Sequence, residues 1–249
     1  MRKYILLIVF SFVLGMLIGD IALSKTITID KDTVQLRGAI DASSVSEAMV
    51  SIANSPKETV ILYIESPGGS ILAGDKFITF LHTTPKKVIC VADFAASMAF
   101  SILQQCHKRY VTDGGILMQH VASWGVSGQD PNNRSMIKLI ESIVLRAEKQ
   151  TSKRLRLTLS KYRQLIRDDI WMLGNEAFKY RAIDGVVTAV CTDDMYKGSI
   201  NKKTRSFFTT IEVAYSACPL VPAPVTNSRE ERSSWDSIYI KNINQLEMK

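Results

Sequence analysis

Residues 59–81 read TVILYIESPGGSILAGDKFITFL, a buried strand pattern that a Ser-Pro-Gly-Gly turn separates from a helix pattern. The apolar run over 59–65 has the length of a strand, and apolar residues after the turn recur at helical spacing. Residues 87–106, KVICVADFAASMAFSILQQC, repeat this order, with a strand over 87–92 and a helix over 98–106. Such alternation predicts an α/β fold with helices packed on a largely parallel sheet.

The same alternation of strand and helix patterns extends on both sides of this stretch. A helix is expected over 44–53, where Ser44 and Glu47 have the spacing of a capping box. Further strands are expected over 34–40, 109–112, 116–119 and 183–190, and further helices from about Pro131, Ser160 and Asn175. Beyond about Ser199 the pattern weakens and prolines recur, which indicates an extension and not a second core. The sequence thus predicts one domain over 25–198 and a C-terminal extension over 199–249.

The composition excludes several classes of protein. The chain has 249 residues, of which 46% are hydrophobic and 22% charged. This excludes a wholly disordered chain, a collagen-like fibre and a cysteine-dense mini-protein. Lys and Arg number 31 against 24 Asp and Glu, which gives a formal net charge of +7.

The first 24 residues have the pattern of an export signal. Arg2 and Lys3 precede an uncharged run over 5–18, and small residues at Ala22 and Ser24 suit a signal peptidase. We therefore expect cleavage before Lys25; the alternative is an uncleaved anchor over residues 4–23. Either case predicts a periplasmic or otherwise exported domain.

Export makes the four cysteines candidates for disulfides, which have three pairings. Cys90 lies in an apolar run and is expected to be a small core residue. Cys191 and Cys218 flank the start of the extension, and we hypothesise that they staple it to the domain. No cysteine pair has metal-ligand spacing.

The basic excess is concentrated in residues 134–167, which hold ten Lys and Arg but two Asp and Glu. One interpretation is a face that meets an anionic lipid surface or an acidic partner. The interpretation we favour is a solvated helix surface. Nucleic-acid binding is not expected, because no aromatic residues are interleaved with these charges.

Two turns have residues suited to acyl chemistry. Ser97 follows a strand and precedes a helix, among small residues, where free N–H groups favour negative charge. An N-cap serine is the commoner use of such a position. Gly68 and Gly69 follow the strand over 59–65 and allow N–H groups to point into a cavity, although an ordinary tight turn has the same residues.

A base and its partner are also present. Of three histidines, His120 follows an apolar strand, at the edge of the sheet where α/β folds place their functional sites. An equally good interpretation is that His120 is a hydrogen-bonded histidine of the core. Asp168 and Asp169 are the candidates for a carboxylate that would orient the imidazole, with one expected to face inward and the other to be solvated. No His, Cys and carboxylate cluster has ligand spacing, so neither a metal site nor a cofactor is expected.

Six short motifs occur in the order seen in the proteolytic subunit of Clp protease. They are ESPGGS at 65–70, FAASM at 94–98, KRY at 108–110, MQH at 118–120, Asp169-x-Trp171, and Glu176-Ala177 with Asp184-Gly185. The sequence thus resembles the ClpP-like peptidases over about residues 30–190. The resemblance implies the ClpP/crotonase fold, a spiral of ββα units with a protruding handle helix, here from about residue 131 to 150.

The resemblance also implies the roles of the site residues. Ser97 would be the nucleophile, His120 the general base and Asp169 the orienting acid. Gly68 and Met98 would donate the oxyanion hydrogen bonds, with Gly69 shaping the turn. The implied function is an exported serine endopeptidase that forms an acyl-enzyme with peptides or unfolded protein and assembles as a homo-oligomer. Dependence on an ATP-driven partner is not expected outside the cytoplasm, and contact with a membrane surface stays open.

Two rival interpretations remain at this stage. One is a signal-peptide-peptidase-like membrane protease with a Ser–Lys dyad, for which Lys149 and Lys153 are the candidate bases. The other is an exported scaffold that keeps the fold and has lost the catalytic geometry. A crotonase-type enzyme is disfavoured, because coenzyme A is scarce outside the cytoplasm.

Overall fold

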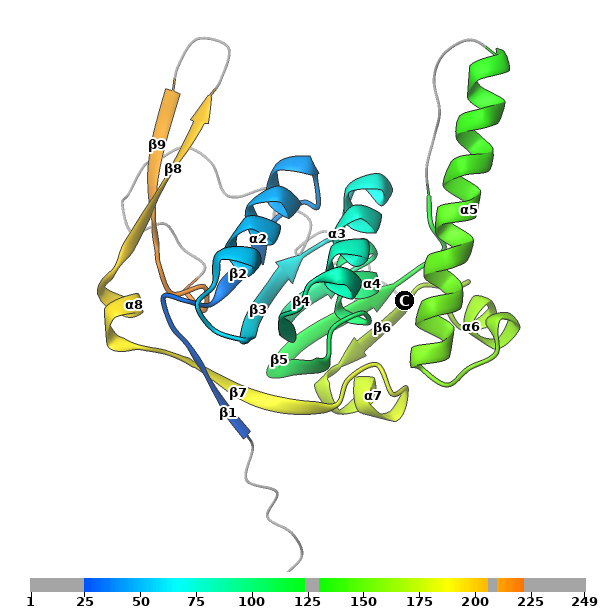
Figure 1. The fold of residues 1–249 in the computed structure, drawn as a ribbon. Coiled ribbons are helices and arrows are strands. Elements are labelled where there is room, and N and C mark those ends of the chain that lie inside the picture. The colour runs from blue at the N-terminus through cyan, green and yellow to red at the C-terminus, as the bar shows by residue number, and fades with distance from the viewer. Residues whose placement is uncertain (1–24, 124–129, 206–209, 222–249) are drawn as a thin grey trace, which may run out of the picture.

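The structure is a computed structural model that describes residues 25–123, 130–205 and 210–221. Within these residues seven strands form one sheet in the order β1-β7-β5-β4-β3-β2, with β6 paired to β5. Every pairing in this sheet is parallel except that of β6 with β5. The predicted α/β class with a largely parallel sheet is confirmed (Figure 1).

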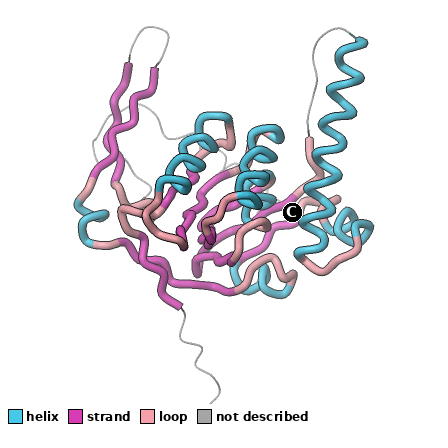
Figure 2. The backbone as a smooth tube through the Cα atoms, in the orientation of Figure 1, coloured by secondary structure: helices cyan, strands magenta, loops and turns pink. Residues whose placement is uncertain are grey.

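Both ends of the described chain contribute to the architecture. The sheet strands are β1 (Lys25–Ile29), β2 (Val34–Arg37), β3 (Thr59–Ser66), β4 (Lys87–Ala96), β5 (Lys108–Gln119), β6 (Ile170–Leu173) and β7 (Gly185–Cys191). The helices are α2 (Ala42–Asn54), α3 (Ile71–Thr83), α4 (Met98–Leu103), α5 (Asp130–Arg154), α6 (Leu159–Leu165), α7 (Gly174–Lys179) and α8 (Asp193–Lys197). An antiparallel hairpin follows, of β8 (Ser199–Arg205) and β9 (Thr210–Ser216). Figure 2 shows α5 and this hairpin projecting beyond the sheet on opposite sides.

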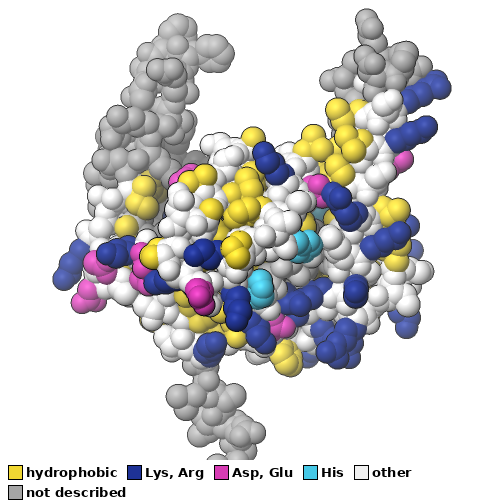
Figure 3. Space-filling view, in the orientation of Figure 1, with side chains coloured by type: hydrophobic (Ala, Val, Ile, Leu, Met, Phe, Trp, Pro, Cys, Tyr) yellow, Lys and Arg dark blue, Asp and Glu magenta, His cyan; other side chains and the backbone are white. Residues whose placement is uncertain are grey.

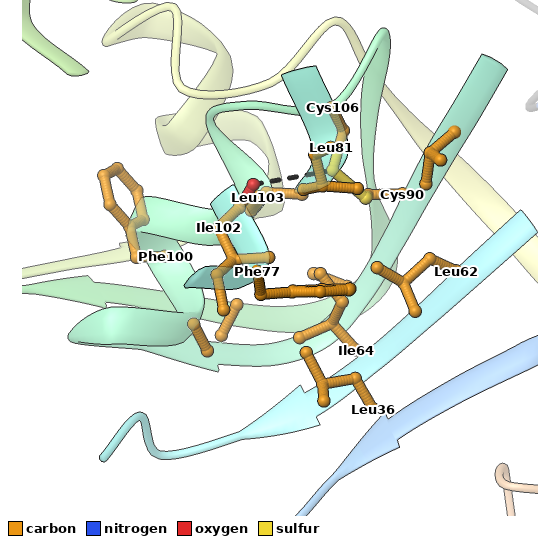
Figure 4. Packing of buried hydrophobic residues seen from close by; sticks show 14 of the residues in the cluster. Leu36, Leu62, Ile64, Phe77, Leu81, Cys90, Phe100, Ile102, Leu103 and Cys106 are labelled. Atoms are coloured by element: carbon orange, nitrogen blue, oxygen red, sulfur yellow. Dashed lines mark hydrogen bonds between the residues drawn. A yellow bond between two sulfur atoms is a disulfide. The ribbon is translucent and has the colours of Figure 1, made fainter. Parts of the chain in front are cut away.

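The main hydrophobic core lies between the central strands and helices α2, α3 and α4. Phe77 of α3 is fully buried and packs in one cluster with Leu62 of β3 and Leu36 of β2 (Figure 4). β3 and β4 are apolar along most of their length because central strands of a parallel sheet are covered on both faces. This core fixes the position of the β4–α4 connection, where Ser97 lies.

The N-cap of α2 differs from the sequence prediction. The capping residue of α2 is Asp41, whose side chain accepts a hydrogen bond from the Ser44 backbone N–H (2.8 Å). Ser44 occupies the third helical position, and its hydroxyl oxygen accepts from the Asp41 N–H. The capping box therefore exists, but it begins three residues earlier than predicted, because Asp41 already ends the extended backbone.

All four cysteines form disulfides, and one pairing corrects a prediction. Cys90 of β4 is bonded to Cys106, which follows α4, with 5.9 Å between their Cα atoms. Cys90 is fully buried, so the apolar run around it was correctly assigned to the core, but it is not a free core residue. The predicted Cys191–Cys218 bridge is present and ties the segment after β9 to the end of β7.

A second, smaller core lies around this bridge. Cys218 is fully buried and packs in one cluster with Ile29 of β1, Tyr63 of β3 and Met195 of α8. The segment after β9 thus packs on the domain, as the stapling hypothesis required. β8 and β9 pair as a hairpin, whereas the sequence pattern indicated only an extension without regular elements of its own.

Three strands differ from the sequence expectations. β5 is continuous through Asp113-Gly114-Gly115, where two short strands were expected, because both halves pair with β4 across a register shift. β1 and β6 were not predicted; both are short, and β6 has a single buried residue. The export signal predicted for residues 1–24 lies outside the described residues. Within the described residues, no helix is both long and apolar enough to cross a bilayer.

Candidate active site

Ser97 occupies a sharp turn between β4 and α4. Its φ is 55° and its ψ is −117°, a backbone conformation that side-chain-bearing residues seldom adopt. The turn is possible because Ala95, Ala96 and Ala99 are small and almost fully buried. A hydrogen bond from the Ser97 N–H to the Met118 carbonyl (3.0 Å) fixes the turn against β5. The hydroxyl is thereby held at the edge of the sheet, at the first turn of a helix.

His120 lies directly after β5 and faces Ser97. Its Nε2 atom is 2.8 Å from the Ser97 hydroxyl oxygen, within hydrogen-bonding distance. The parallel pairing of β4 with β5 accounts for this proximity, because Ala96 is in register with Met118 and both chains then leave the sheet. The structure therefore brings together the nucleophile and the base proposed from the sequence.

Gln119 positions His120 through a network that sequence reasoning did not identify. Its side-chain oxygen accepts from the His120 backbone N–H (3.2 Å). Its amide nitrogen donates to the Ser101 hydroxyl (3.1 Å) and the Tyr162 hydroxyl (3.0 Å). Burial is the largest influence on Tyr162 and raises its pKa to about 12, so this phenol remains neutral at ordinary pH. The motif Met-Gln-His placed Gln119 beside the histidine, but only the fold shows its buried partners.

The glycine turn after β3 lies against the nucleophile. Gly68 has a φ of 97°, and a Cβ atom there would lie 2.7 Å from the Ala96 carbonyl oxygen and 2.8 Å from the Met98 nitrogen. Only glycine allows this approach of the two backbones. Gly69 instead contacts Ile40, whose carbonyl accepts from the Ser70 N–H and whose N–H donates to the Gly68 carbonyl. Gly69 thus shapes the turn, while Gly68 and Met98 lie next to Ser97.

Asp169 lies in register with the base but forms no hydrogen bond with it among the described residues. The last residue pair of β5 and β6 is Gln119 with Ile170, so Asp169 and His120 are the next positions along the two antiparallel chains. Asp169 is exposed and has a φ of 49°. Among the hydrogen bonds between described residues, none joins it to His120. Asp168, the other sequence candidate, has a side chain that is 79% exposed and pairs with Arg167.

Ser97 and His120 line a cavity of about 380 Å³. Its apolar wall includes Ile143 and Val144 of α5, and Tyr162 and Ile166 of the α6 region form another side. Trp171 of β6 lines it as well, near the strand end that carries Asp169. A nucleophile–base pair on the wall of a partly apolar cavity is the arrangement that a peptide-cleaving site requires.

The sequence model of the Clp protease family matches residues 24–190, which include this entire constellation. The chain belongs to the Clp protease family. It is 30% identical over 162 residues to the ATP-dependent Clp protease proteolytic subunit 2 of Tropheryma whipplei (strain Twist), covering 62% of this chain and 90% of that protein. It is 31% identical over 168 residues to proteolytic subunit 3 of Rhodococcus jostii (strain RHA1), covering 63% of this chain and 81% of that protein.

Membership of this family establishes the class of activity. The chain is a serine-type peptidase, and Clp-family proteolytic subunits form oligomers and act on peptide substrates. The fold agrees, because the mixed α/β architecture with a mostly parallel sheet is consistent with the ClpP fold. The resemblance inferred from the short sequence motifs is thereby confirmed.

The lysines considered for a Ser–Lys dyad lie elsewhere in this Clp-family chain. Lys149 and Lys153 are both exposed on α5, and neither is among the residues that line the Ser97 cavity. Lys153 lines a different surface hollow. In the described part of the chain, no cluster of three or more His, Cys, Asp or Glu side chains is arranged to hold a metal ion.

Proposed function

We propose that the chain is an exported serine endopeptidase in which Ser97, His120 and Asp169 hydrolyse peptide bonds through an acyl-enzyme. The observation that carries this proposal is the 2.8 Å contact between the Ser97 hydroxyl and His120 Nε2 on the wall of the cavity. A serine hydroxyl is a weak nucleophile at neutral pH unless an adjacent base accepts its proton. The contact with Nε2 supports His120 as that base.

The chemical steps follow from this arrangement. As Ser97 Oγ bonds to the carbonyl carbon of the substrate, its proton passes to His120 Nε2. The imidazolium then gives this proton to the departing amine, and the peptide C–N bond breaks. Water, deprotonated by the same imidazole, attacks the ester and releases the acid. Asp169 would orient the imidazole through Nδ1, which requires its side chain to move inward from the exposed position described above.

The oxyanion would bind to the backbone N–H groups of Gly68 and Met98. Met98 is the first residue of α4, so its N–H has no carbonyl partner within the helix. The Gly68 N–H donates at 3.2 Å to the Ser66 hydroxyl, a neutral acceptor that a developing negative charge would outcompete. Loss of one such donor typically costs about 2.7–4 kcal/mol of barrier.

A fluorophosphonate probe tests the nucleophile directly. We expect wild-type protein to be labelled covalently at Ser97 and Ser97→Ala to remain unlabelled, as measured by intact mass and peptide mapping. Ser142→Ala, which removes an exposed hydroxyl that donates to the Lys138 carbonyl on α5, is the matched control and should label fully. Labelling is done on the assembled species isolated by size, because active sites in this family belong to oligomers. A folded, assembled wild type without label would leave only the scaffold interpretation.

Export is the second part of the proposal, and the two disulfides support it. Disulfides persist in oxidising compartments and are rare in the reducing cytosol. An exported peptidase would work without an ATP-driven unfoldase, unlike the relatives whose names describe ATP-dependent proteases. We expect protein recovered from the exported fraction to show no free thiol before reduction and four after it. Four free thiols in the native protein, or its recovery only from the cytoplasm, would contradict export.

A further inference from the structure

A second hollow, with a volume of about 1060 Å³, lies away from the Ser97 cavity and is strongly basic. Its cationic side chains are Lys108, Arg109, Lys153, Arg154, Arg156, Lys179 and Arg181, and Asp184 is its one carboxylate. We call this surface the basic hollow. Its formal balance of +6 approaches the net charge of +7 of the whole chain. In Figure 3, Lys and Arg side chains gather at the lower right of the molecule, where α5 and α7 lie in Figure 1.

The floor of the basic hollow is held by hydrogen bonds of a buried arginine, and its positive charge is only partly neutralised. Arg109 is buried and donates to both Asp184 carboxylate oxygens, and also to Gln104 and the Arg181 carbonyl. Arg154 lies 3.7 Å from the same carboxylate. Burial, then the nearby charge of Arg109, lowers the pKa of Arg154. One carboxylate therefore serves two guanidinium groups, and the floor remains positive.

The rim has five more cations without neutralising partners. Lys108, Lys153, Arg156, Lys179 and Arg181 are exposed, and none of them forms an ion pair with another described residue. Solvated basic residues scattered over a surface do not indicate a function, but these five basic residues line a single concavity. Mutual repulsion of five like charges is unfavourable, and a multivalent anionic surface relieves it.

Exposed aromatic side chains occur among these cations. The run Phe178-Lys179-Tyr180-Arg181 alternates aromatic and basic residues at the end of α7. Phe178 is 59% exposed and lines the basic hollow, and Tyr180 is 40% exposed. A small free anion gives no reason for unburied aromatic rings beside the cations. Rings at the level of headgroups beside Lys and Arg are the pattern of a membrane-binding surface.

Lys25, the first described residue, lies close to this surface. Lys25 begins β1, and its ammonium group contacts Tyr110, two residues from Lys108. Tyr110 is in register with Gly185, which follows Asp184. Lys25 therefore lies at the same end of the sheet as the basic hollow.

We propose that the basic hollow is the surface by which the protein lies on an anionic membrane, with the phosphates of lipid headgroups between its cations and Phe178 at the interface. This rests on the export part of the proposed function and not on the catalytic residues. Polybasic surfaces of this kind bind anionic bilayers in a salt-dependent way.

Vesicle binding of the full chain, purified as exported, tests this proposal. Vesicles of phosphatidylcholine alone are compared with vesicles that also contain phosphatidylglycerol, at low and high salt. Co-sedimentation measures binding, and hydrogen exchange measures protection of residues 174–184. We expect protection only on anionic vesicles and its loss at high salt. Because protection is local, it reports on the basic hollow whether or not the N-terminal segment is retained.

Charge variants decide between this surface and a general effect of net charge. The triple variant Lys108→Gln, Lys153→Gln, Lys179→Gln should weaken binding to anionic vesicles by about 100-fold and abolish the protection. The matched control, Lys76→Gln, Lys161→Gln, Lys197→Gln, removes three exposed charges outside the basic hollow and should bind within about threefold of wild type. Equal effects of the two variants would overturn the proposal. So would equal protection on neutral vesicles, or stronger protection by polyglutamate than by anionic vesicles.

The catalytic proposal is tested independently of the membrane-binding proposal. Peptide hydrolysis in solution, without vesicles, should be unchanged in the basic-hollow triple variant, and Ser97→Ala should bind anionic vesicles like wild type. A protein that binds these vesicles but hydrolyses no peptide would refute the catalytic proposal alone.

Discussion

Replacing Ser97 with Ala is expected to lower kcat for a fluorogenic peptide by roughly 10⁶-fold, and replacing His120 with Ala by a similar factor. The double variant should be no worse than either single variant. The reason is the 2.8 Å contact between the two side chains, because a hydroxyl without its base and a base without its hydroxyl are both inactive. Steady-state kinetics of the three variants, with their assembly state checked, measures this.

The control for this experiment must keep the fold. Ser142→Ala should retain kcat within about twofold, because its hydroxyl is exposed and donates to a carbonyl of its own helix, α5. Independent, multiplicative losses in the double variant would show that Ser97 and His120 do not act as a unit. Substantial turnover by Ser97→Ala would show that another group is the nucleophile.

Asp169→Asn is expected to lower kcat by roughly 10⁴-fold if Asp169 orients the imidazole during turnover. An amide is neutral and presents a donor where the imidazole N–H needs an acceptor, so the wrong tautomer is favoured and the imidazolium loses a stabilising charge. Peptide kinetics of the assembled enzyme measures kcat. The pH profile of kcat/KM adds a second readout, because losing a neighbouring carboxylate lowers the pKa of the base.

Asp168→Asn is the matched control, since it changes the same functional group one residue away. Its side chain is 79% exposed and pairs with Arg167 3.4 Å away, so we expect kcat within about twofold of wild type. Equal kcat values for the two variants would remove Asp169 from the mechanism. The His120–Ser97 pair would then act without a carboxylate from this segment.

Most of the catalytic arrangement was predictable because it depends on where strands end. Ser97 and His120 each follow an apolar strand, and parallel neighbouring strands end at one edge of a sheet. The relation of Gly68 to Ser97 was predictable only through the family resemblance. The Gln119 network was not predictable, because Ser101 and Tyr162 come from helices whose packing no local pattern encodes.

Asp169 shows where the sequence argument stops. Counting back from Glu176-Ala177 matches Asp169, and not Asp168, to the aspartate of the family. The register of β5 with β6 then places Asp169 opposite His120. Whether its carboxylate reaches the imidazole depends on the side-chain conformation and on a backbone φ of 49°. The spacing of residues along the sequence specifies neither.

The fold predictions failed where tertiary pairing outweighs local preference. Gly114 and Gly115 are poor strand residues, yet β5 continues through them because β4 is paired on both sides of the irregularity. Cys90 was correctly assigned to the core, but its bond to Cys106 was not predicted, because burial and disulfide bonding give the same apolar surroundings. β6 has a single buried residue and so gives no period of two. β1 does alternate exposed and buried residues over 26–29, but it is only five residues long and directly follows the predicted export signal.

The disulfide topology has a consequence for a peptidase exposed to its own activity. Cys90 and Cys106 stand on either side of Ser97, and Cys191 and Cys218 stand on either side of the β8–β9 hairpin. A single self-inflicted cut inside either covalent ring opens the backbone without releasing a fragment. The nicked molecule keeps both of its pieces at high local concentration, and so damage at these two places does not by itself dismantle the protein.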